Sequence, residues 1–169
     1  MAASYSRNNK MPYFGICLGL QVMVIEYSRR VCKLKEANST EFVQACATPV
    51  ISLLSEQIDV KAYGGTMRLG KSETKLKKDT HIFRSYQSKT IFERHRHRYE
   101  VANRFREMLT AKGLIVSGVT PDDALVESIE WPGHPWGVGV QFHPEFKSKP
   151  TQPNPLFTRF IEACCEKTD

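Results

Sequence analysis

The segment Gly15-Ile16-Cys17-Leu18-Gly19 constrains this chain most, because it sets a cysteine between two glycines directly after an apolar run. Residues 11–16 are typical of a short buried strand, and residues 18–30 carry apolar side chains at helical spacing. Cys17 is therefore predicted to lie at a strand-to-helix turn. In such a nucleophile elbow, glycines let the backbone pass close on either side, and the thiol projects into a cleft above the sheet.

Two interpretations of Cys17 are open on these residues alone. Free cysteine is among the most buried residue types, so a cysteine after a strand is usually part of the core. The flanking glycines favour the other interpretation, an exposed nucleophile. The start of the following helix supplies partial positive charge, which is expected to favour the thiolate form of Cys17 over the thiol.

A nucleophilic cysteine needs a base and a group that orients the base, and the segment Gln141-Phe142-His143-Pro144-Glu145 offers both. It follows the apolar run 136–140, which is typical of a strand entering a core. If the chain stays extended through Pro144, His143 and Glu145 lie on one side, since strand side chains repeat every two residues. One imidazole nitrogen then faces Glu145 and the other faces Cys17. An exposed histidine at a strand end is the alternative for His143.

The remaining chain predicts a mixed succession of strands and helices in one unit. Strands are expected at residues 49–54, 66–76, 114–119 and 124–130, and a helix at 101–112. Asn154-Pro155 is typical of a helix start, with Asn as the cap and Pro at the first position. The apolar residues expected on one face of that helix are Phe157, Phe160, Ile161 and Cys164.

The elbow and the late Gln-Phe-His-Pro-Glu resemble the motifs of class I glutamine amidotransferases. Residues 37–42, 64–70 and 93–101 are similar to the glutaminase domain of CTP synthases in particular. The resemblance runs over nearly the whole chain. It implies an α/β fold with an open, mostly parallel sheet flanked by helices, flavodoxin-like and missing its first strands.

By the same resemblance, residues 1–169 are a partial glutamine amidotransferase domain. Complete domains of the family begin with strands and helices that precede the elbow, including a Gly-Gly-Phe-Gly-type loop that supplies half of the oxyanion hole. Residues 1–10 look like the end of the helix that follows this loop. The synthase domain and the start of the glutaminase domain are therefore expected to lie outside this sequence.

The resemblance implies that L-glutamine is hydrolysed to glutamate and ammonia by a triad of Cys17, His143 and Glu145. The backbone amide of Leu18 is implied to be an oxyanion donor. In the whole enzyme, the ammonia serves an ATP-dependent amination of UTP to CTP. The alternative is a catalytically silent fragment or interaction module, since losing one oxyanion donor typically costs about 10²–10³ in turnover.

The resemblance also implies the residues that bind substrate. Gln21 and Glu41 are implied to line the glutamine pocket, with Glu41 suited to the α-ammonium group. Arg98 is implied to contact the substrate carboxylate, which the guanidinium fork matches in geometry. Without the motif around it, Glu41 is equally consistent with a solvated carboxylate in a helix or turn.

Residues 64–70 resemble a lid loop over the glutaminase site that is linked to activation by GTP, and Arg68 belongs to this loop. Glycines at both ends of the loop permit hinge-like backbone changes. A plain hairpin connection with a solvated arginine is an equally good interpretation of Arg68. No cofactor is expected in this fragment, whereas the resemblance implies ATP and Mg in the full enzyme, with GTP as activator.

Charge leaves a nucleic-acid partner open, because the net charge is +6 and basic residues gather at 71–78 and 94–98. No helix-turn-helix, RNA-recognition or zinc-finger pattern accompanies this charge, so no nucleic acid is expected. In an extended strand, Arg94, Arg96 and Arg98 share one face and His95 and His97 the other. Two histidines without a nearby third ligand make a weak metal site, so no metal is expected.

The expected partners are L-glutamine, the synthase domain and, for the full enzyme, further copies in a homo-oligomer. No run approaches the roughly 18 apolar residues of a membrane span, and the start of the chain lacks the layout of a signal peptide. The five cysteines show no paired framework, which argues for reduced thiols. A cytoplasmic location without membrane contact is therefore expected.

Overall fold

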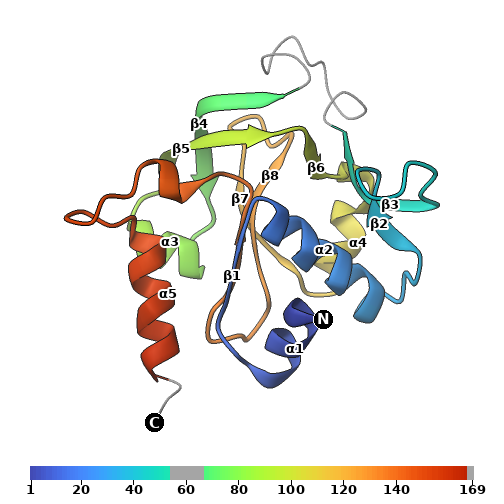
Figure 1. The fold of residues 1–169 in the computed structure, drawn as a ribbon, viewed down its shortest axis with the longest axis horizontal. Helices are drawn as coiled ribbons and strands as arrows, with labels where there is room; N and C mark the ends of the chain where they lie inside the picture. The colour runs from blue at the N-terminus through green and yellow to red at the C-terminus, as the bar shows by residue number, and fades with distance from the viewer. Residues whose placement is uncertain (54–66, 167–169) are drawn as a thin grey trace.

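A curled mixed sheet of six strands, in the order β1-β9-β8-β7-β4-β5, forms the centre of the fold (Figure 1). The computed structural model describes residues 1–53 and 67–166. The strands of this sheet are β1 (Tyr13–Ile16), β4 (Arg68–Leu76), β5 (Thr90–His97), β7 (Ile115–Val119), β8 (Val126–Glu130) and β9 (Gly137–Val140). A smaller sheet holds β2 (Ala37–Ser39), β3 (Thr48–Leu53) and β6 (Tyr99–Val101) in that order.

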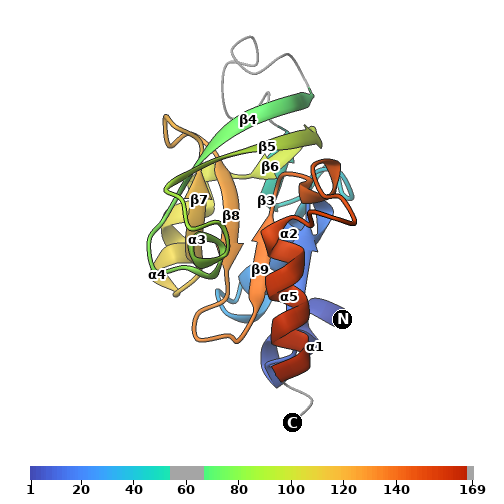
Figure 2. The same cartoon turned by 90° about the vertical axis from the view of Figure 1, so that its left-hand side faces the viewer.

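Helices cover both faces of the larger sheet (Figures 1 and 2). They are α1 (Ala2–Asn9), α2 (Leu18–Arg30), α3 (His81–Tyr86), α4 (Arg106–Ala111) and α5 (Pro155–Glu166), with the 3-10 turns η3 (Asn103–Phe105) and η4 (Pro144–Phe146). One hydrophobic core joins the sheet to α2 and α4, and a second joins it to α3 and α5. The sheet therefore separates two cores.

The Gly-Val-Gly-Val sequence of β9 shows how one strand serves both cores. Val138 and Val140 are fully buried in the core beneath α3 and α5. Gly139 points to the other face, where a Cβ atom would lie 2.8 Å from the sulfur of Met23 on α2. Alternation of valine and glycine thus fills one face and lets α2 approach the other closely.

The structure confirms the α/β class, although most of the described strand pairs are antiparallel. In the larger sheet, β1 and β9 pair in parallel, whereas every other neighbouring pair is antiparallel. Residues 120–125 join β7 to β8, and residues 131–136 join β8 to β9. Segments this short form hairpins, since a parallel pair needs a crossover of a dozen or more residues.

The two helices with the clearest sequence signals are confirmed. α2 spans Leu18–Arg30 as expected, and α5 begins at Pro155. The Asn154 side chain caps α5, because its Oδ1 accepts a hydrogen bond from the Leu156 N–H at 3.0 Å. Of the residues expected on one face of α5, Phe160 packs against the second core, whereas Ile161 is 58% exposed, and Leu156 is the fully buried residue of the helix.

Other predicted elements need smaller corrections. The four expected strands are found as β3, β4, β7 and β8, with slightly different ends, and residues 54 and 66 of the expected strands lie outside the described residues. The helix expected at 101–112 begins later, because Val101 ends β6 and pairs with Ile51 of β3. The elements α3 and β2 have no counterpart among the predicted elements. Both are short, and α3 depends on a local cap in which Thr80 Oγ1 accepts the Phe83 N–H.

Gly15 is the position in β1 where a side chain cannot fit. A Cβ atom there would lie 2.6 Å from the carbonyl carbon of Gly19, in the backbone of α2. We expect Gly15→Ala to lower the free energy of unfolding by about 1–3 kcal/mol, because α2 must move away from the sheet. Urea denaturation followed by circular dichroism measures this change.

Gly19→Ala is the matched control, since no atom lies within 4 Å of a Cβ at Gly19. Alanine also has the higher helix propensity, by roughly 1 kcal/mol, so stability should stay unchanged or rise slightly. Equal losses of stability in the two variants would contradict the close-approach explanation of Gly15.

Candidate active site

Cys17 occupies a strained turn between β1 and α2. Its backbone has φ 51° and ψ −101°, in a region that non-glycine residues rarely adopt. The Cys17 N–H donates to the carbonyl of Val140 at 2.7 Å, which ties the turn to the end of β9. The predicted position of Cys17 at a strand-to-helix turn is confirmed, and such strain is typical of a nucleophile elbow.

His143 leaves the sheet at the same edge as Cys17. β1 and β9 are parallel neighbours with Ile16 opposite Val140, so the chain continues from both strands on one side of the sheet. The Nδ1 atom of His143 lies 2.6 Å from Oε1 of Glu145. The expectation of an extended chain is wrong here, because Pro144 opens the 3-10 turn η4, and this turn brings the two side chains together.

Phe146 holds the imidazole of His143 from one face. The two rings are stacked, with centroids 4.8 Å apart and an interplanar angle of 13°. Nδ1 is engaged by Glu145, and Nε2 is buried without a hydrogen-bond partner among the described residues. With Nδ1–H donating to the carboxylate, Nε2 is the nitrogen left to exchange a proton. No sequence signal points to this role of Phe146.

The segment that carries His143 is anchored on β5. The His143 N–H donates to the carbonyl of Arg94 at 2.8 Å, and Nζ of Lys147 donates to the carbonyl of Phe92 at 2.5 Å. Lys147 also lies 3.4 Å from the buried carboxylate of Glu93. The position of the imidazole therefore depends on β5 as well as on β9.

Two side-chain amides, those of Gln141 and Gln21, link the Cys17 thiol to the interior. Nε2 of Gln141 lies 3.6 Å from Sγ of Cys17, and its Oε1 accepts from Nε2 of Gln21 at 3.4 Å. Gln21 also donates to the carbonyl of Tyr99 at 3.0 Å. The structure thus brings the predicted pocket residue Gln21 next to Cys17. Gln141 lies in the motif that the sequence singles out, yet its contact with the thiol is visible only in the structure.

The pKa of the Cys17 thiol lies above its ordinary value, with burial as the largest cause. Negative charge on Glu100, Glu145 and Glu41 raises it further, whereas a hydrogen bond from the Leu18 backbone N–H lowers it. The expectation that the helix start favours the thiolate is therefore wrong in its net direction. Removal of water and the surrounding carboxylates outweigh the amide of Leu18.

Comparison with known proteins shows the family. Residues 1–163 match the family model described as "Glutamine amidotransferase class-I". The chain belongs to the class I glutamine amidotransferases.

Curated relatives of this amidotransferase chain include two bacterial CTP synthases. It is 54% identical to the CTP synthase of Geobacter sulfurreducens over 168 residues, which is 99% of this chain and 31% of that protein. It is 53% identical to the CTP synthase of Clostridium acetobutylicum over 164 residues, which is 97% of this chain and 31% of that protein. The chain therefore spans less than a third of the length of these relatives.

Two solved structures resemble the amidotransferase fold described here. The Trypanosoma brucei CTPS glutaminase domain with bound acivicin matches with a TM-score of 0.89 and 38% identity, over 98% of this chain and 64% of that chain. A putative GMP synthase subunit from Thermoplasma acidophilum matches with a TM-score of 0.63 and 16% identity, over 99% of this chain and 64% of that chain. The second likeness supports the fold alone.

The implied substrate-binding charges lie at the surface of the amidotransferase domain. Glu41 is exposed, and its backbone N–H donates to Oγ of Ser39 at 3.1 Å. Arg98 is exposed in the bend between β5 and β6. The negative charge of Glu41 lies near enough to Cys17 to raise the pKa of the thiol. The roles of Glu41 and Arg98 in binding glutamine stay predictions.

Arg68 is buried, at 3% exposure, so the interpretation as a solvated arginine is wrong. Its Nη2 lies 2.5 Å from Oε1 of Glu127, and its Nη1 lies 3.4 Å from Oε1 of Glu100. It also donates to Oγ of Ser72 at 2.9 Å. Residues 64–66 of the implied lid lie outside the described residues, so the lid stays a prediction.

The alternation expected over residues 94–98 is confirmed. The side chains of His95 and His97 are buried, whereas Arg94, Arg96 and Arg98 are exposed. His95 lies 3.5 Å from the carboxylate of Glu127, and His97 lies 2.6 Å from that of Glu100. Burial lowers the pKa of His95, so its ring is neutral. Among residues 1–53 and 67–166, no group of three or more histidine, cysteine or carboxylate side chains is arranged to hold a metal ion.

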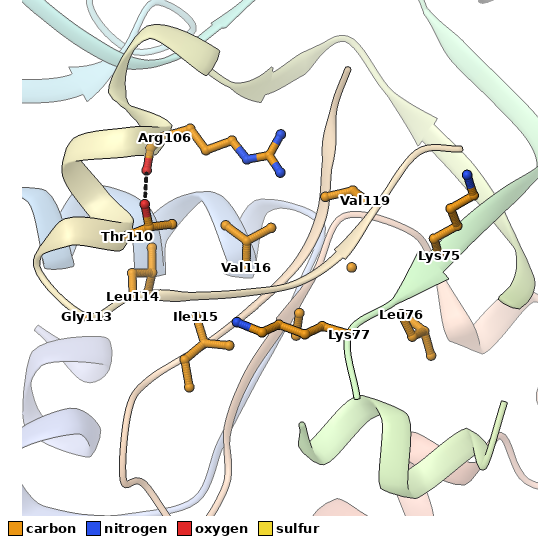
Figure 3. A pocket seen from close by; sticks show the side chains of 12 residues that line it. Lys75, Leu76, Lys77, Arg106, Thr110, Gly113, Leu114, Ile115, Val116 and Val119 are labelled. Atoms are coloured by element: carbon orange, nitrogen blue, oxygen red, sulfur yellow. Dashed lines mark hydrogen bonds between the residues drawn. The ribbon is translucent and has the colours of Figure 1, made fainter. Parts of the chain in front are cut away.

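A cavity of about 630 Å³ lies away from this site, between β4, β7 and α4 (Figure 3). Its lining includes the cations Lys75, Lys77 and Arg106. Arg106 pairs with Asp123 at 2.6 Å, and Nζ of Lys75 donates to the carbonyl of Pro121 at 2.6 Å. The predicted site residues are not part of its described lining.

No helix of the described ranges has the length and apolar character needed to cross a membrane.

The raised pKa of Cys17 predicts how its reaction with iodoacetamide depends on pH. Below that pKa the group is the unreactive thiol, so the rate should be low at neutral pH and still rise above about pH 8.5, the ordinary cysteine pKa. Mass spectrometry of the Cys17 peptide after timed exposure measures the rate. The free peptide of residues 13–21 is the control, and a rate that levels off at lower pH in the folded chain than in this peptide contradicts the prediction.

Proposed function

We propose that this chain is the glutaminase part of a CTP synthase. It hydrolyses L-glutamine to glutamate and ammonia, and the ammonia serves an ATP-dependent amination of UTP to CTP on a synthase domain. One observation carries the proposal most directly. A strained elbow cysteine lies at the same sheet edge as a histidine bound to a carboxylate, in a chain 53–54% identical to CTP synthases.

The first half of the reaction forms a thioester. Because the resting thiol is protonated, His143 takes its proton through Nε2 as Sγ of Cys17 attacks the side-chain amide carbon of glutamine. The imidazolium then passes this proton to the amide nitrogen, and the carbon–nitrogen bond breaks to release ammonia. Glu145 keeps the ring oriented and stabilises its positive charge, as the 2.6 Å contact to Nδ1 supports.

The second half of the reaction releases glutamate. His143 removes a proton from water, which attacks the thioester carbon, and the proton returns to the departing sulfur of Cys17. Each half passes through an oxyanion, and the backbone N–H of Leu18 lies at the start of α2, where it meets that charge. The hydrogen bond of this N–H toward the thiol supports the assignment.

Substrate recognition follows from the charges beside the elbow. We assign the α-ammonium group of glutamine to Glu41 and its carboxylate to Arg98, with Gln21 lining the pocket. The roles of ATP and Mg on a synthase domain, GTP as activator, assembly into a homo-oligomer and a cytoplasmic location stay predictions from the resemblance.

A silent fragment or interaction module is the second candidate. Leu18 is 47% exposed and Val22 is 37% exposed on the outer face of α2. They lie one helical turn apart, so further protein could contact both at once, as in an apolar interaction surface. This candidate predicts that the chain releases no ammonia from glutamine and that Cys17 does not react with electrophiles that mimic glutamine.

Labelling with diazo-oxo-norleucine, an electrophile that mimics glutamine, separates the two candidates. We expect covalent modification at Cys17 and protection by L-glutamine. His143→Ala should slow the labelling by about 10²–10⁴, the usual contribution of a general acid or base. Mass spectrometry of the intact chain and of its cysteine peptides measures the extent and the site.

Cys17→Ser is the control for this experiment, because it keeps the shape of the elbow and removes the reactive sulfur. Labelling that persists in Cys17→Ser, or that L-glutamine does not slow, would contradict the glutaminase proposal and favour the silent module.

A further inference from the structure

Five buried titratable or charged side chains lie behind the bend that carries Arg98, and the proposed reaction uses none of them. They are Arg68 of β4, His95 and His97 of β5, Glu100 of β6 and Glu127 of β8. Figures 1 and 2 show β4, β5 and β6 passing beside one end of β8. We call these five side chains the buried charge network.

Glu127 is the member of the network that a backbone hydrogen bond links to the residues around Cys17. Its side chain is fully buried, and its backbone carbonyl accepts the N–H of Gln141 at 2.8 Å. The side chain of Gln141 in turn reaches Sγ of Cys17 at 3.6 Å. The residue that carries this buried carboxylate is therefore hydrogen-bonded through its backbone to Gln141, a neighbour of the elbow.

Arg68 connects this point to the smaller sheet. Its guanidinium group touches Glu127 at 2.5 Å on one side and Glu100 at 3.4 Å on the other. Glu127 belongs to the six-stranded sheet and Glu100 to the three-stranded sheet. The planar guanidinium group thus bridges one buried carboxylate of each sheet at this place.

The bend at Arg98 is held from both sides by this arrangement. On one side, Nε2 of His97 lies 2.6 Å from Oε1 of Glu100, which closes the bend across Arg98. On the other, the carbonyl of Tyr99 accepts from Gln21 at 3.0 Å. The backbone before and after Arg98 is thus fixed, while the Arg98 side chain itself is exposed.

Stability alone is a poor explanation of the buried charge network. Two buried carboxylates share one arginine, and the neutral His95 lies 3.5 Å from Glu127 with no hydrogen bond to its ring nitrogens among the described residues. Replacing such buried ion pairs by apolar side chains is often neutral or even stabilising. What this network supplies, and apolar packing cannot, is a defined direction for the bend.

We propose that Glu127 is a positioning residue for substrate binding. Through Arg68 and Glu100, it holds residues 97–99 in the conformation that presents Arg98 to the α-carboxylate of glutamine. This inference rests on the proposed glutaminase function, in which Arg98 binds that carboxylate. Glu127 touches neither the substrate nor the reacting atoms, so its effect appears in the affinity for substrate and not in the rate of the bond-making step.

Glu127→Gln tests this role in the full chain, because it keeps the shape of the side chain and removes the charge that holds Arg68. The concentration dependence of labelling by diazo-oxo-norleucine separates affinity from maximal rate. We expect the half-saturating concentration to rise about tenfold, the consequence of losing a well-placed charge-assisted contact, with the maximal rate unchanged. Arg68→Lys, which keeps the charge and loses the planar fork, should act in the same direction and serves if Glu127→Gln does not fold.

Glu130→Gln is the matched control on the same strand. Glu130 is also buried, but its carboxylate accepts the backbone N–H groups of His81 and Ile82 at 2.9 and 3.0 Å, at the start of α3. We expect this variant to lose stability and to keep the parent's half-saturating concentration. A similar rise in Glu127→Gln and Glu130→Gln would reduce Glu127 to a structural role.

A double-mutant cycle with Arg98→Gln tests whether Glu127 acts through Arg98. If it does, Glu127→Gln does not raise the half-saturating concentration further in a chain that already carries Arg98→Gln. Additive effects of the two substitutions overturn the inference, because Glu127 then acts by another route.

Hydrogen exchange keeps the inference distinguishable from the proposed function. The amides of residues 97–101 should exchange faster in Glu127→Gln than in the parent or in Glu130→Gln. If the parent is not labelled at all, the glutaminase proposal fails, and the exchange rates still decide whether Glu127 holds the bend. If the parent is labelled while half-saturation and exchange are unchanged in Glu127→Gln, the glutaminase proposal stands and the inference is overturned.

Discussion

The parallel pairing of β1 with β9 is the constraint on which the candidate site depends. It places Ile16 opposite Val140, so the two chains leave the sheet together, and the Cys17 N–H closes onto the Val140 carbonyl at 2.7 Å. Glycines on the α2 side of both strands make this possible, because a Cβ at Gly15 or Gly139 would meet α2 within 3 Å. A side chain there would push the helix away and relax the strained backbone of Cys17. The conformation of the elbow therefore depends on the close packing of α2 against the two strands.

In the proposed function, the electrostatics around Cys17 keep the sulfur protonated before glutamine binds. Burial raises the pKa of Cys17, and three carboxylates raise it further, so the resting sulfur keeps its proton. A cation placed among these carboxylates shifts the balance toward the thiolate. In the proposed function, the α-ammonium group of glutamine is such a cation, and it approaches Glu41, one of the three. Binding of the correct substrate then lowers the barrier to deprotonation by His143, and a protonated thiol is protected from other electrophiles in the meantime.

The sequence predicted what depends on local patterns. The span of α2, the cap of α5 at Asn154 and the alternation of arginine and histidine along β5 all follow from neighbouring residues and are confirmed. The position of Cys17 at the elbow followed from its two glycines. The contact of His143 with Glu145 was also anticipated, although by an extended chain where the structure has a 3-10 turn. The fixed φ of Pro144 favours that turn, whereas the alternation of side chains along a strand assumes an extended backbone at every residue.

What the sequence could not supply depends on groups that the fold brings together from distant strands. The sequence left Arg68 open between a lid-loop residue and a solvated arginine, since nothing near it in the chain reveals that Glu100 and Glu127 surround its guanidinium group. The same pairs show that β5 supports two parts of the site. It anchors the His143 segment through the carbonyl of Arg94, and it leads into the bend of Arg98. A shift of this one strand would therefore move both His143, the proposed base, and Arg98, the proposed carboxylate contact, and the buried contacts of Arg68 oppose such a shift.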